Sequence, residues 1–242
     1  MPEQLVPEQL VPLLAPAVAL LVVGHGGLWR IARTVVTIAH EGGHAMIAVL
    51  TGRRLAGIRL HSDTSGVTVS VGRTTGPGMV LTALAGYLAP SLLGLGAAGL
   101  VTVGWTRPLL WLGVALLLAT LIYVRNWFGG VAVLLTGGLV GVVAWYGSPA
   151  VQLAFCAVLA WFLLFGGLRA DRELGQGRRR QVRRRDYPLD SDADQLARLT
   201  GLPPWLWVGL FTVVGLGAVA LGGWWLLGDV LLQLARRAGI PT

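Results

Sequence analysis

The chain has 242 residues, of which 55% are hydrophobic and only 12% charged, and its mean hydropathy is +0.70. Soluble globular domains carry roughly twice that share of charged residues, so the composition excludes an ordinary soluble enzyme or binding module. The single cysteine, Cys156, excludes an internal disulfide framework and a cysteine metal cluster. The composition predicts one integral membrane domain over residues 1–242.

The basic residues are all arginine, and they give the chain a net charge of +8. Nine of them lie between Arg169 and Arg198, including the run "GRRRQVRRR". A nucleic-acid patch is conceivable, but a basic segment beside apolar helices is typical of a cytoplasmic membrane anchor. We therefore expect the lipid bilayer, and not nucleic acid, as a partner, with residues 169–202 forming an arginine-rich cytoplasmic loop.

Taken in chain order, seven apolar stretches approach or exceed the length that crosses about 30 Å of hydrocarbon. They are residues 8–23, 27–50, 78–104, 108–124, 127–146, 149–168 and 203–227. The first is the least regular, because Pro7, Pro12 and Pro16 distort a helix. It also lacks the features of a cleaved signal peptide, so we expect it in the mature chain. The pattern predicts an all-α polytopic membrane protein with six to seven transmembrane helices.

The arginines also predict an orientation in the cell membrane. If residues 169–202 are cytoplasmic, counting back through the spans places residues 51–76 and their four arginines on the cytoplasmic side as well. Arg30, Arg33 and Arg107 fall on the opposite side and disagree with the rule.

Between the second and third predicted spans the period of the sequence changes. Residues 55–73 alternate apolar and polar side chains around the turn sequence "SDTSG", which is the pattern of a β-hairpin. We expect a small cytoplasmic hairpin there. It can be a plain structural element, or the strand of Leu60 or of Val69 can offer an exposed edge to an extended substrate peptide.

The segment "TIAHEGGHA" places His40, Glu41 and His44 inside the second apolar stretch. Histidines four residues apart share one face of a helix, so their imidazoles can converge on one metal ion. Glu41 can then lie beside the metal and take a proton from water. Ionised groups at the centre of a spanning helix cost about 2.5–3.5 kcal/mol each, so they should have partners. The alternative is that the histidines only hydrogen-bond to neighbouring helices.

The HEGGH segment at residues 40–44, followed by a small hairpin and further spans, resembles the site-2 protease (M50) class of membrane-embedded zinc metallopeptidases, especially its M50B-like branch. The resemblance implies a Zn²⁺ cofactor held by His40 and His44, and water activation by Glu41. It also implies cleavage of a peptide bond in a membrane-protein or peptide substrate. A third metal ligand is implied from an aspartate far downstream.

The Asn-Pro…Leu-Asp-Gly context that usually surrounds this aspartate is missing. The chain offers "YPLDSDADQLARLTGLPP", and the M50B-like branch has a similar Ser-Asp-Ala segment before its last span, so Asp192 is the candidate ligand. Ser191 would cap a short helix over residues 192–200 and set Asp192 in its first turn. This segment is expected on the same side of the membrane as the end of the predicted 27–50 helix that lies closer to His44. Asp190 and Asp194 remain as alternatives.

Three further polar residues need an interpretation. Asn126 begins a span, and an asparagine of site-2 proteases helps to hold the substrate. Its motif "RNWFGG" does not match closely, so an interfacial hydrogen-bonding role is the alternative. His25 and His61 lie outside the four-residue spacing, and we interpret them as membrane-boundary and hairpin residues.

Two functions besides a protease are compatible with these residues. Helical His-Glu-x-x-His sites also line the transport paths of metal-ion permeases, and a catalytically silent membrane scaffold could keep the same fold. The sequence predicts neither the substrate nor the oligomeric state.

Overall fold

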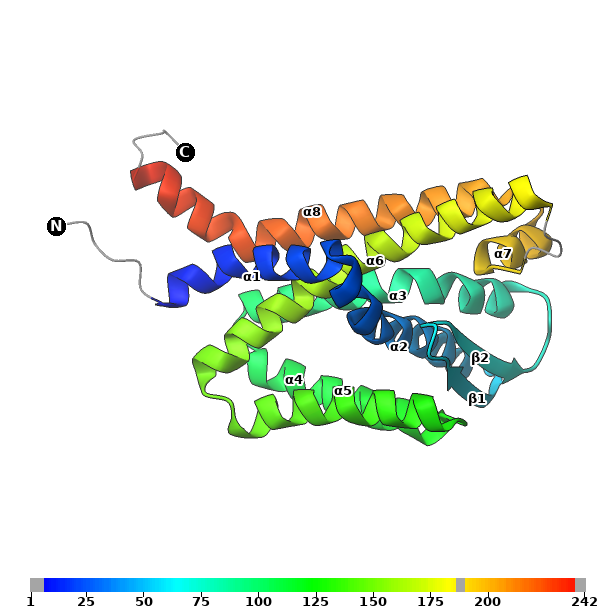
Figure 1. Ribbon diagram of the computed structural model, residues 1–242, viewed down its shortest axis with the longest axis horizontal. Coiled ribbons are helices and arrows are strands. Elements are labelled where there is room, and N and C mark those ends of the chain that lie inside the picture. The colour runs from blue at the N-terminus through cyan, green and yellow to red at the C-terminus, as the bar shows by residue number, and fades with distance from the viewer. Residues whose placement is uncertain (1–6, 186–189, 238–242) are drawn as a thin grey trace.

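The computed structural model describes residues 7–185 and 190–237. Its elements are α1 (Pro7–Gly24), α2 (Gly26–Leu50), β1 (Arg54–Leu60), β2 (Gly66–Val71), α3 (Pro77–Thr102), α4 (Thr106–Tyr123), α5 (Trp127–Tyr146), α6 (Pro149–Arg184), α7 (Asp192–Thr200) and α8 (Pro204–Arg237). Figure 1 shows the long helices side by side, with the two strands and α7 at one end of the bundle. The start of α1 and the end of α8 lie at the other end. The protein is thus an all-α bundle with one small sheet, as predicted.

Five helices are long and apolar enough to cross a membrane, namely α3, α4, α5, α6 and α8. α1 and α2 pass the same test only as a pair, which is bent by 101° at the break between them. The residue at the break is His25, whose Nδ1 accepts a hydrogen bond from the backbone of Leu28 and caps α2. The separate spans expected at residues 8–23 and 27–50 are therefore one bent pair, and the lower number of six transmembrane spans fits the structure.

The start of α2, which carries Arg30 and Arg33, lies against α6. Arg33 forms an ion pair with Glu173 of α6 at 3.3 Å, and Arg169 of α6 donates to a carbonyl at the end of α1. The start of α2 thus lies beside the arginine-bearing part of α6, where the rule expects basic residues. Arg107, at the start of α4, remains an exception.

Where we expected a loop from residue 169 onward, α6 continues as a helix to Arg184. Arginine, glutamate and glutamine are good helix formers, so the change from apolar to basic residues does not end the helix. At 36 residues α6 is about 54 Å long, which exceeds the hydrocarbon thickness and carries its basic end beyond the bilayer. Residues 186–189 lie outside the described residues, and α7 follows over the range expected for a helix capped by Ser191.

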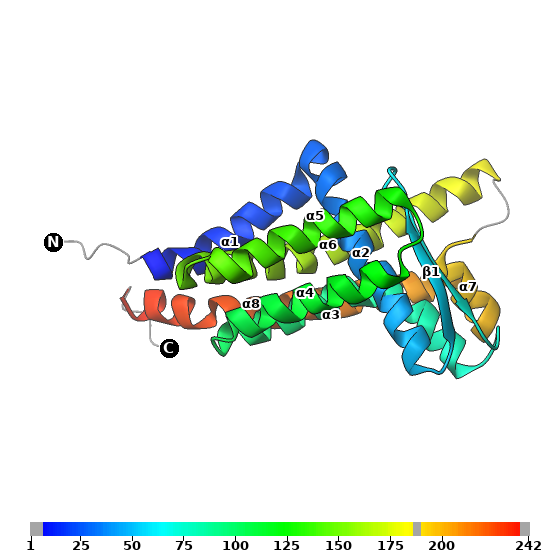
Figure 2. The ribbon, with the colours of Figure 1, turned by 90° about the horizontal axis from the view of Figure 1, so that it is seen from below.

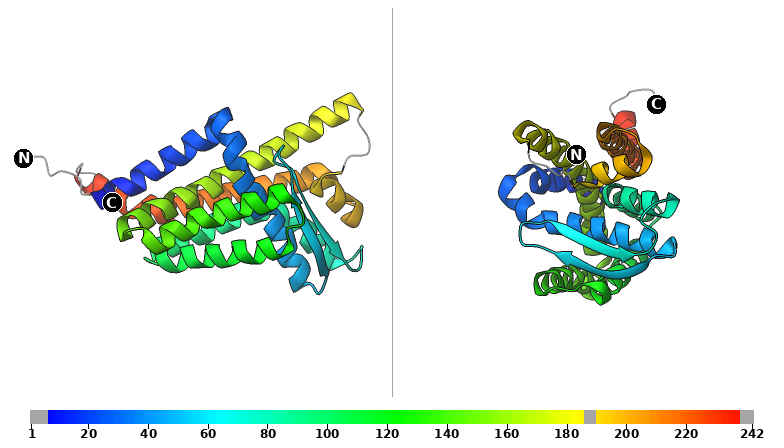
Figure 3. Two further views of the ribbon diagram at one scale, coloured as in Figure 1. Left: turned by 60° about the horizontal axis from the view of Figure 1, so that its bottom comes forward. Right: turned by 90° about the vertical axis from the view of Figure 1, so that its right-hand side faces the viewer.

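The hairpin predicted for residues 55–73 is confirmed. β1 and β2 pair in antiparallel fashion, from Arg54 opposite Val71 to Leu60 opposite Gly66. Figures 2 and 3 show this sheet lying across the end of the bundle that also holds α7. It therefore covers the helix that carries the HEGGH segment.

The close packing of α2 on α3 depends on a glycine. A Cβ at Gly43 would lie 2.5 Å from the Cβ of Ala89 and 2.8 Å from the carbonyl oxygen of Ala85, closer than real Cβ contacts. A Cβ at Gly42 would meet only the hydroxyl of Thr120, at 4.0 Å. Of the two glycines in the HEGGH segment, Gly43 permits the helix contact and Gly42 leaves open space.

Gly43→Ala should therefore lower the thermal stability of the protein, whereas Gly42→Ala should not. Overpacking costs about 1–3 kcal/mol, while alanine favours a helix by about 1 kcal/mol over glycine. Melting temperatures of the two purified variants, followed by tryptophan fluorescence in detergent, would measure the difference. Identical melting of Gly43→Ala and wild type would contradict the packing described here.

Candidate metal centre

His40 and His44 lie one turn apart on α2, and α7 brings Asp192 to them. The Nε2 atoms of the two histidines are 3.1 Å apart. Oδ2 of Asp192 lies 3.2 Å from Nε2 of His40 and 3.1 Å from Nε2 of His44. Ligand atoms around a tetrahedral zinc, with bonds of about 2.0–2.1 Å, stand roughly 3.3 Å apart. The three donor atoms therefore fit three corners of such a site.

This cluster is the one group of three or more His, Cys, Asp or Glu side chains in the described part of the chain that could hold a metal ion. A permease would need further polar groups along a continuous route. Within residues 7–185 and 190–237 no second group of this kind is found.

The second ring nitrogen of His44 fixes the direction of its imidazole. Nδ1 lies 2.7 Å from the backbone carbonyl oxygen of Thr82 on α3. Because a carbonyl only accepts hydrogen bonds, Nδ1 carries a proton and donates it to Thr82, which turns Nε2 toward the cluster. Nothing in the sequence points to Thr82, since any residue could supply that carbonyl.

α3 also forms one wall of the cluster. A Cβ at Gly86 would collide with the ring of His44 and lie 2.7 Å from Cε1 of His40, so only glycine fits there. The next residue, Tyr87, packs edge-on against His40 with ring centroids 4.6 Å apart. The two imidazoles are thereby confined between α3 and α7.

Glu41 is buried beneath β2, with only 3% of its surface exposed. The hydroxyl of Thr68 donates to Oε2 of Glu41 at 2.6 Å. A Cβ at Gly66 would lie 2.5 Å from Oε1 of Glu41, so the absence of a side chain at Gly66 lets the strand approach. The carboxylate interacts electrostatically with His44 but is not among the three donors. The sequence did not single out Gly66 or Thr68, because the alternation of apolar and polar residues was the only pattern visible in that strand.

The three candidate aspartates have different partners. Asp194 forms an ion pair with Arg178 of α6 at 2.5 Å and closes the capping box of α7. Asp190 is exposed and forms an ion pair with Arg198 at 3.0 Å. Of the three, only Asp192 lies at the histidines, and the contact between Arg178 and Asp194 holds its helix in place.

The histidines keep Asp192 ionised. Burial alone raises the pKa of its carboxyl group, but the charges and hydrogen bonds of His44 and His40 act more strongly and hold that pKa well below its usual range. A carboxylate, and not a carboxylic acid, is the form that binds a metal cation.

Asn126 covers the edge of β1 at Leu60. Its Oδ1 accepts a hydrogen bond from the Leu60 N–H at 3.1 Å, and its Nδ2 donates to the Leu60 carbonyl at 2.6 Å. Both backbone groups that a peptide would need at Leu60 are thus bonded within the chain. The edge of β2, the strand of Val69, pairs with no other described strand. Substrate contact by Asn126 stays a prediction, and the structure gives its amide another partner.

A family model described as Peptidase M50B-like matches residues 13–222 of the chain. The match runs from α1 into α8 and includes the metal cluster, Glu41 and the hairpin. No curated protein and no solved structure matches the chain.

Arg178→Gln should weaken metal binding even though Arg178 donates no atom to the cluster. The change leaves the buried Asp194 carboxylate without its ion-pair partner and so loosens the helix that carries Asp192. Groups that support metal ligands typically contribute about 10–100-fold in affinity, so we expect roughly tenfold weaker zinc binding in a chelator competition. Arg179→Gln removes an exposed neighbouring arginine and should leave the affinity unchanged; equal affinities in the two variants would contradict the role of Arg178.

Proposed function

The chain belongs to the M50B-like peptidase family, and from this premise we propose that it is a membrane-embedded zinc endopeptidase. The family and the apolar helices establish a protease-type protein with several membrane spans. The zinc ion, the reaction and the substrate contacts are our proposal. The observation that carries it is the convergence of His40, His44 and Asp192 from two distant helices, next to the carboxylate of Glu41.

His40, His44 and Asp192 would hold the zinc ion, because two imidazoles and one carboxylate form a donor set that suits Zn²⁺. A zinc ion bound there lowers the pKa of water and polarises a carbonyl group. The hydrogen bond from Nδ1 of His44 to the Thr82 carbonyl would keep the other ring nitrogen directed at the place that such an ion would take.

Glu41 would act as the general base that takes a proton from the attacking water and passes it to the leaving amine. The hydroxyl of Thr68 donates to Oε2, so the carboxylate keeps one direction while Oε1 stays available for the proton. Because Glu41 is present and held in this way, an active enzyme accounts for the site better than a silent scaffold does.

The substrate would bind as an extended peptide at the free edge of β2. Peptide carbonyls in a helix are hydrogen-bonded, so the segment to be cut has to unwind first. In an antiparallel pair, two facing residues either hydrogen-bond to each other or both turn their backbone groups away from the partner strand. Since Leu60 turns its groups away from β2, Gly66 opposite turns its own away from β1, toward the free edge. Gly66 and Thr68 also touch Glu41, so a peptide paired there would lie next to the base.

The proposed location of cleavage follows from the arrangement of the bundle. The hairpin and α7 lie at the end from which the basic part of α6 extends (Figure 2). By the charge rule that end faces the cytoplasm. We therefore expect membrane-protein or peptide substrates to be cut near the cytoplasmic face of the cell membrane.

Zinc content should follow the three donors. We expect about one zinc per chain in wild type, and almost none in His44→Ala or Asp192→Ala, measured by elemental mass spectrometry on protein purified without chelators. Asp190→Ala removes an exposed neighbouring carboxylate and should keep its zinc. If Asp192→Ala also kept its zinc, the third ligand would have to be another residue.

Glu41→Gln should keep the zinc and lose the protease activity. General-base catalysis contributes about 10²–10⁴-fold, so cleavage of a fluorogenic transmembrane peptide should fall at least about a hundredfold. Undiminished cleavage by this variant would exclude Glu41 as the base. Zinc-loaded wild type that cleaves no membrane peptide would instead favour the silent scaffold.

A further inference from the structure

The outer face of the small sheet, which is the face turned away from α2, carries a row of exposed valines. On the inner face of β2, the Thr68 hydroxyl binds Glu41 and Gly66 leaves room for the same carboxylate. Because side chains alternate between the two faces of a strand, the other residues of β2 point outward. These residues include Val67, Val69 and Val71, which are 49%, 47% and 60% exposed.

Two arginines of β1 stand beside the ends of this row. Arg59 is paired with Val67, and Arg54 is paired with Val71. Residues that face each other in an antiparallel pair point to the same face of the sheet. Both arginines are exposed, so their guanidinium groups lie on the outer face next to the valines.

A third arginine, Arg125, fills the middle of the outer face. Gly57 is paired with Val69, and a Cβ at Gly57 would lie 2.5 Å from Cγ of Arg125. The stem of Arg125 therefore takes the place that a side chain at Gly57 would occupy. Its Nη1 donates to the carbonyls of Ile122 and Val124 at 2.7 and 3.3 Å, which bring no negative charge.

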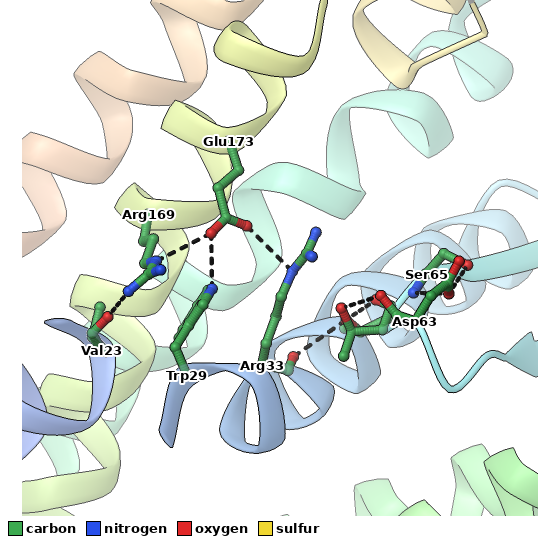
Figure 4. Close-up of polar contacts among 9 residues, drawn as sticks. Val23, Trp29, Arg33, Asp63, Ser65, Arg169 and Glu173 are labelled. Carbon is green, nitrogen blue, oxygen red and sulfur yellow. Dashed lines mark hydrogen bonds and ion pairs between the residues drawn. The ribbon is translucent and has the colours of Figure 1, made fainter. Parts of the chain in front are cut away.

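The hairpin holds no carboxylate that could balance these arginines. Its one acidic residue, Asp63, lies in the turn, where its Oδ1 accepts hydrogen bonds from the backbone and the hydroxyl of Ser65 at 2.9 and 2.7 Å (Figure 4). Among the residues that the structure describes, Arg54, Arg59 and Arg125 take part in no ion pair. The outer face is thus apolar and positively charged at once.

The orientation of this face indicates a partner from the aqueous phase. The right-hand view of Figure 3, taken along the length of the bundle, shows the strands in front of α2. The outer face is therefore directed out of the end of the bundle, and not sideways toward lipid. Three guanidinium groups without counter-charges would also be costly to place in hydrocarbon.

The spacing of the side chains suits a helix. An added strand pairs at the edge of a sheet, whereas the face of a sheet is covered by a helix or by another sheet. Successive valines are two residues apart on the strand, or about 6–7 Å, which is close to the 5.4 Å pitch of an α-helix. A helix along β2 can place apolar residues at i, i+4 and i+7 on the three valines, with carboxylates beside them facing the three arginines.

We propose that the outer face docks an acidic amphipathic helix of a partner protein, with the apolar stripe of the helix on the valines and its carboxylates on Arg54, Arg59 and Arg125. This inference does not depend on the proposed protease activity. Docking on the face uses side chains, whereas pairing at the free edge of β2 uses backbone groups. The helix and an extended peptide would therefore occupy different parts of the sheet.

The test is peptide binding to the purified full-length protein in detergent, measured by fluorescence anisotropy. The probe is a labelled alanine-based helical peptide of about 20 residues, with leucines at i, i+4 and i+7 and a glutamate before each leucine. A second peptide has glutamine in place of glutamate. Because exposed ion pairs each contribute a few-fold in affinity, we expect the glutamate peptide to bind about tenfold tighter. Equal affinities of the two peptides would overturn the proposal.

Variants at exposed positions locate the binding surface. The double variant Arg54→Gln, Arg59→Gln should bind the glutamate peptide about fivefold more weakly and the glutamine peptide like wild type. Val71→Thr keeps a residue suited to a strand and should weaken both peptides by about threefold. Unchanged binding of the glutamate peptide to the double variant would remove the outer face as the site.

Matched controls come from the other end of the bundle. Arg107→Gln at the start of α4 and Val103→Thr at the end of α3 change an exposed arginine and an exposed valine. Both variants should bind the two peptides like wild type. A loss of affinity in these controls equal to that in the hairpin variants would show non-specific binding and would overturn the proposal.

Nanodiscs distinguish a protein partner from the membrane surface. In nanodiscs of phosphatidylcholine, which has no net charge, we expect the glutamate peptide to bind as it does in detergent. Loss of binding in the nanodiscs would show that the bilayer covers the outer face, and would overturn a protein helix as its occupant.

Discussion

The contact between α7 and α2 is the interaction on which the rest of the site depends. His44 and Asp192 are 148 positions apart in the chain, yet their side chains lie within hydrogen-bond distance. The ion pair of Arg178 with Asp194 anchors α7 to α6, and α3 packs against both histidines from the other side. Without the docking of α7 the two histidines of α2 would face a position with no third donor. The long helices therefore hold α7 against the part of α2 that carries the histidines.

The parts of the fold and site that local chemistry determines could be predicted. The histidine spacing on one helix face, the alternation around the hairpin turn and the Ser191 cap all depend on neighbouring residues, and the structure contains each of them. The apolar stretches gave most helix boundaries to within a few residues. Asp192 was predicted partly from a family resemblance, because its neighbours Asp190 and Asp194 are chemically equivalent in sequence.

The remaining features arise from tertiary contacts that composition and periodicity do not encode. The bend at His25 joins two apolar stretches that each read as a separate span. Thr82 contributes its backbone carbonyl, which binds His44. Gly66 contributes by having no side chain, which leaves room for Glu41. α6 continues as a helix because its basic residues are good helix formers, although the same residues indicated a connecting loop. Thr82 and Gly66 act on His44 and Glu41, which are remote from them in the chain, whereas the length of α6 follows from its own residues.

Asn126 has one further consequence for the small sheet. The side-chain amide of Asn126 binds both backbone groups of Leu60 and so takes the place of a neighbouring strand there. Among the described residues the sheet therefore has one open edge, that of β2. One chain can then accept only one added strand. Self-association of two copies through their sheets and capture of a peptide would compete for the same edge, so a dimer formed in that way would be unable to bind substrate there.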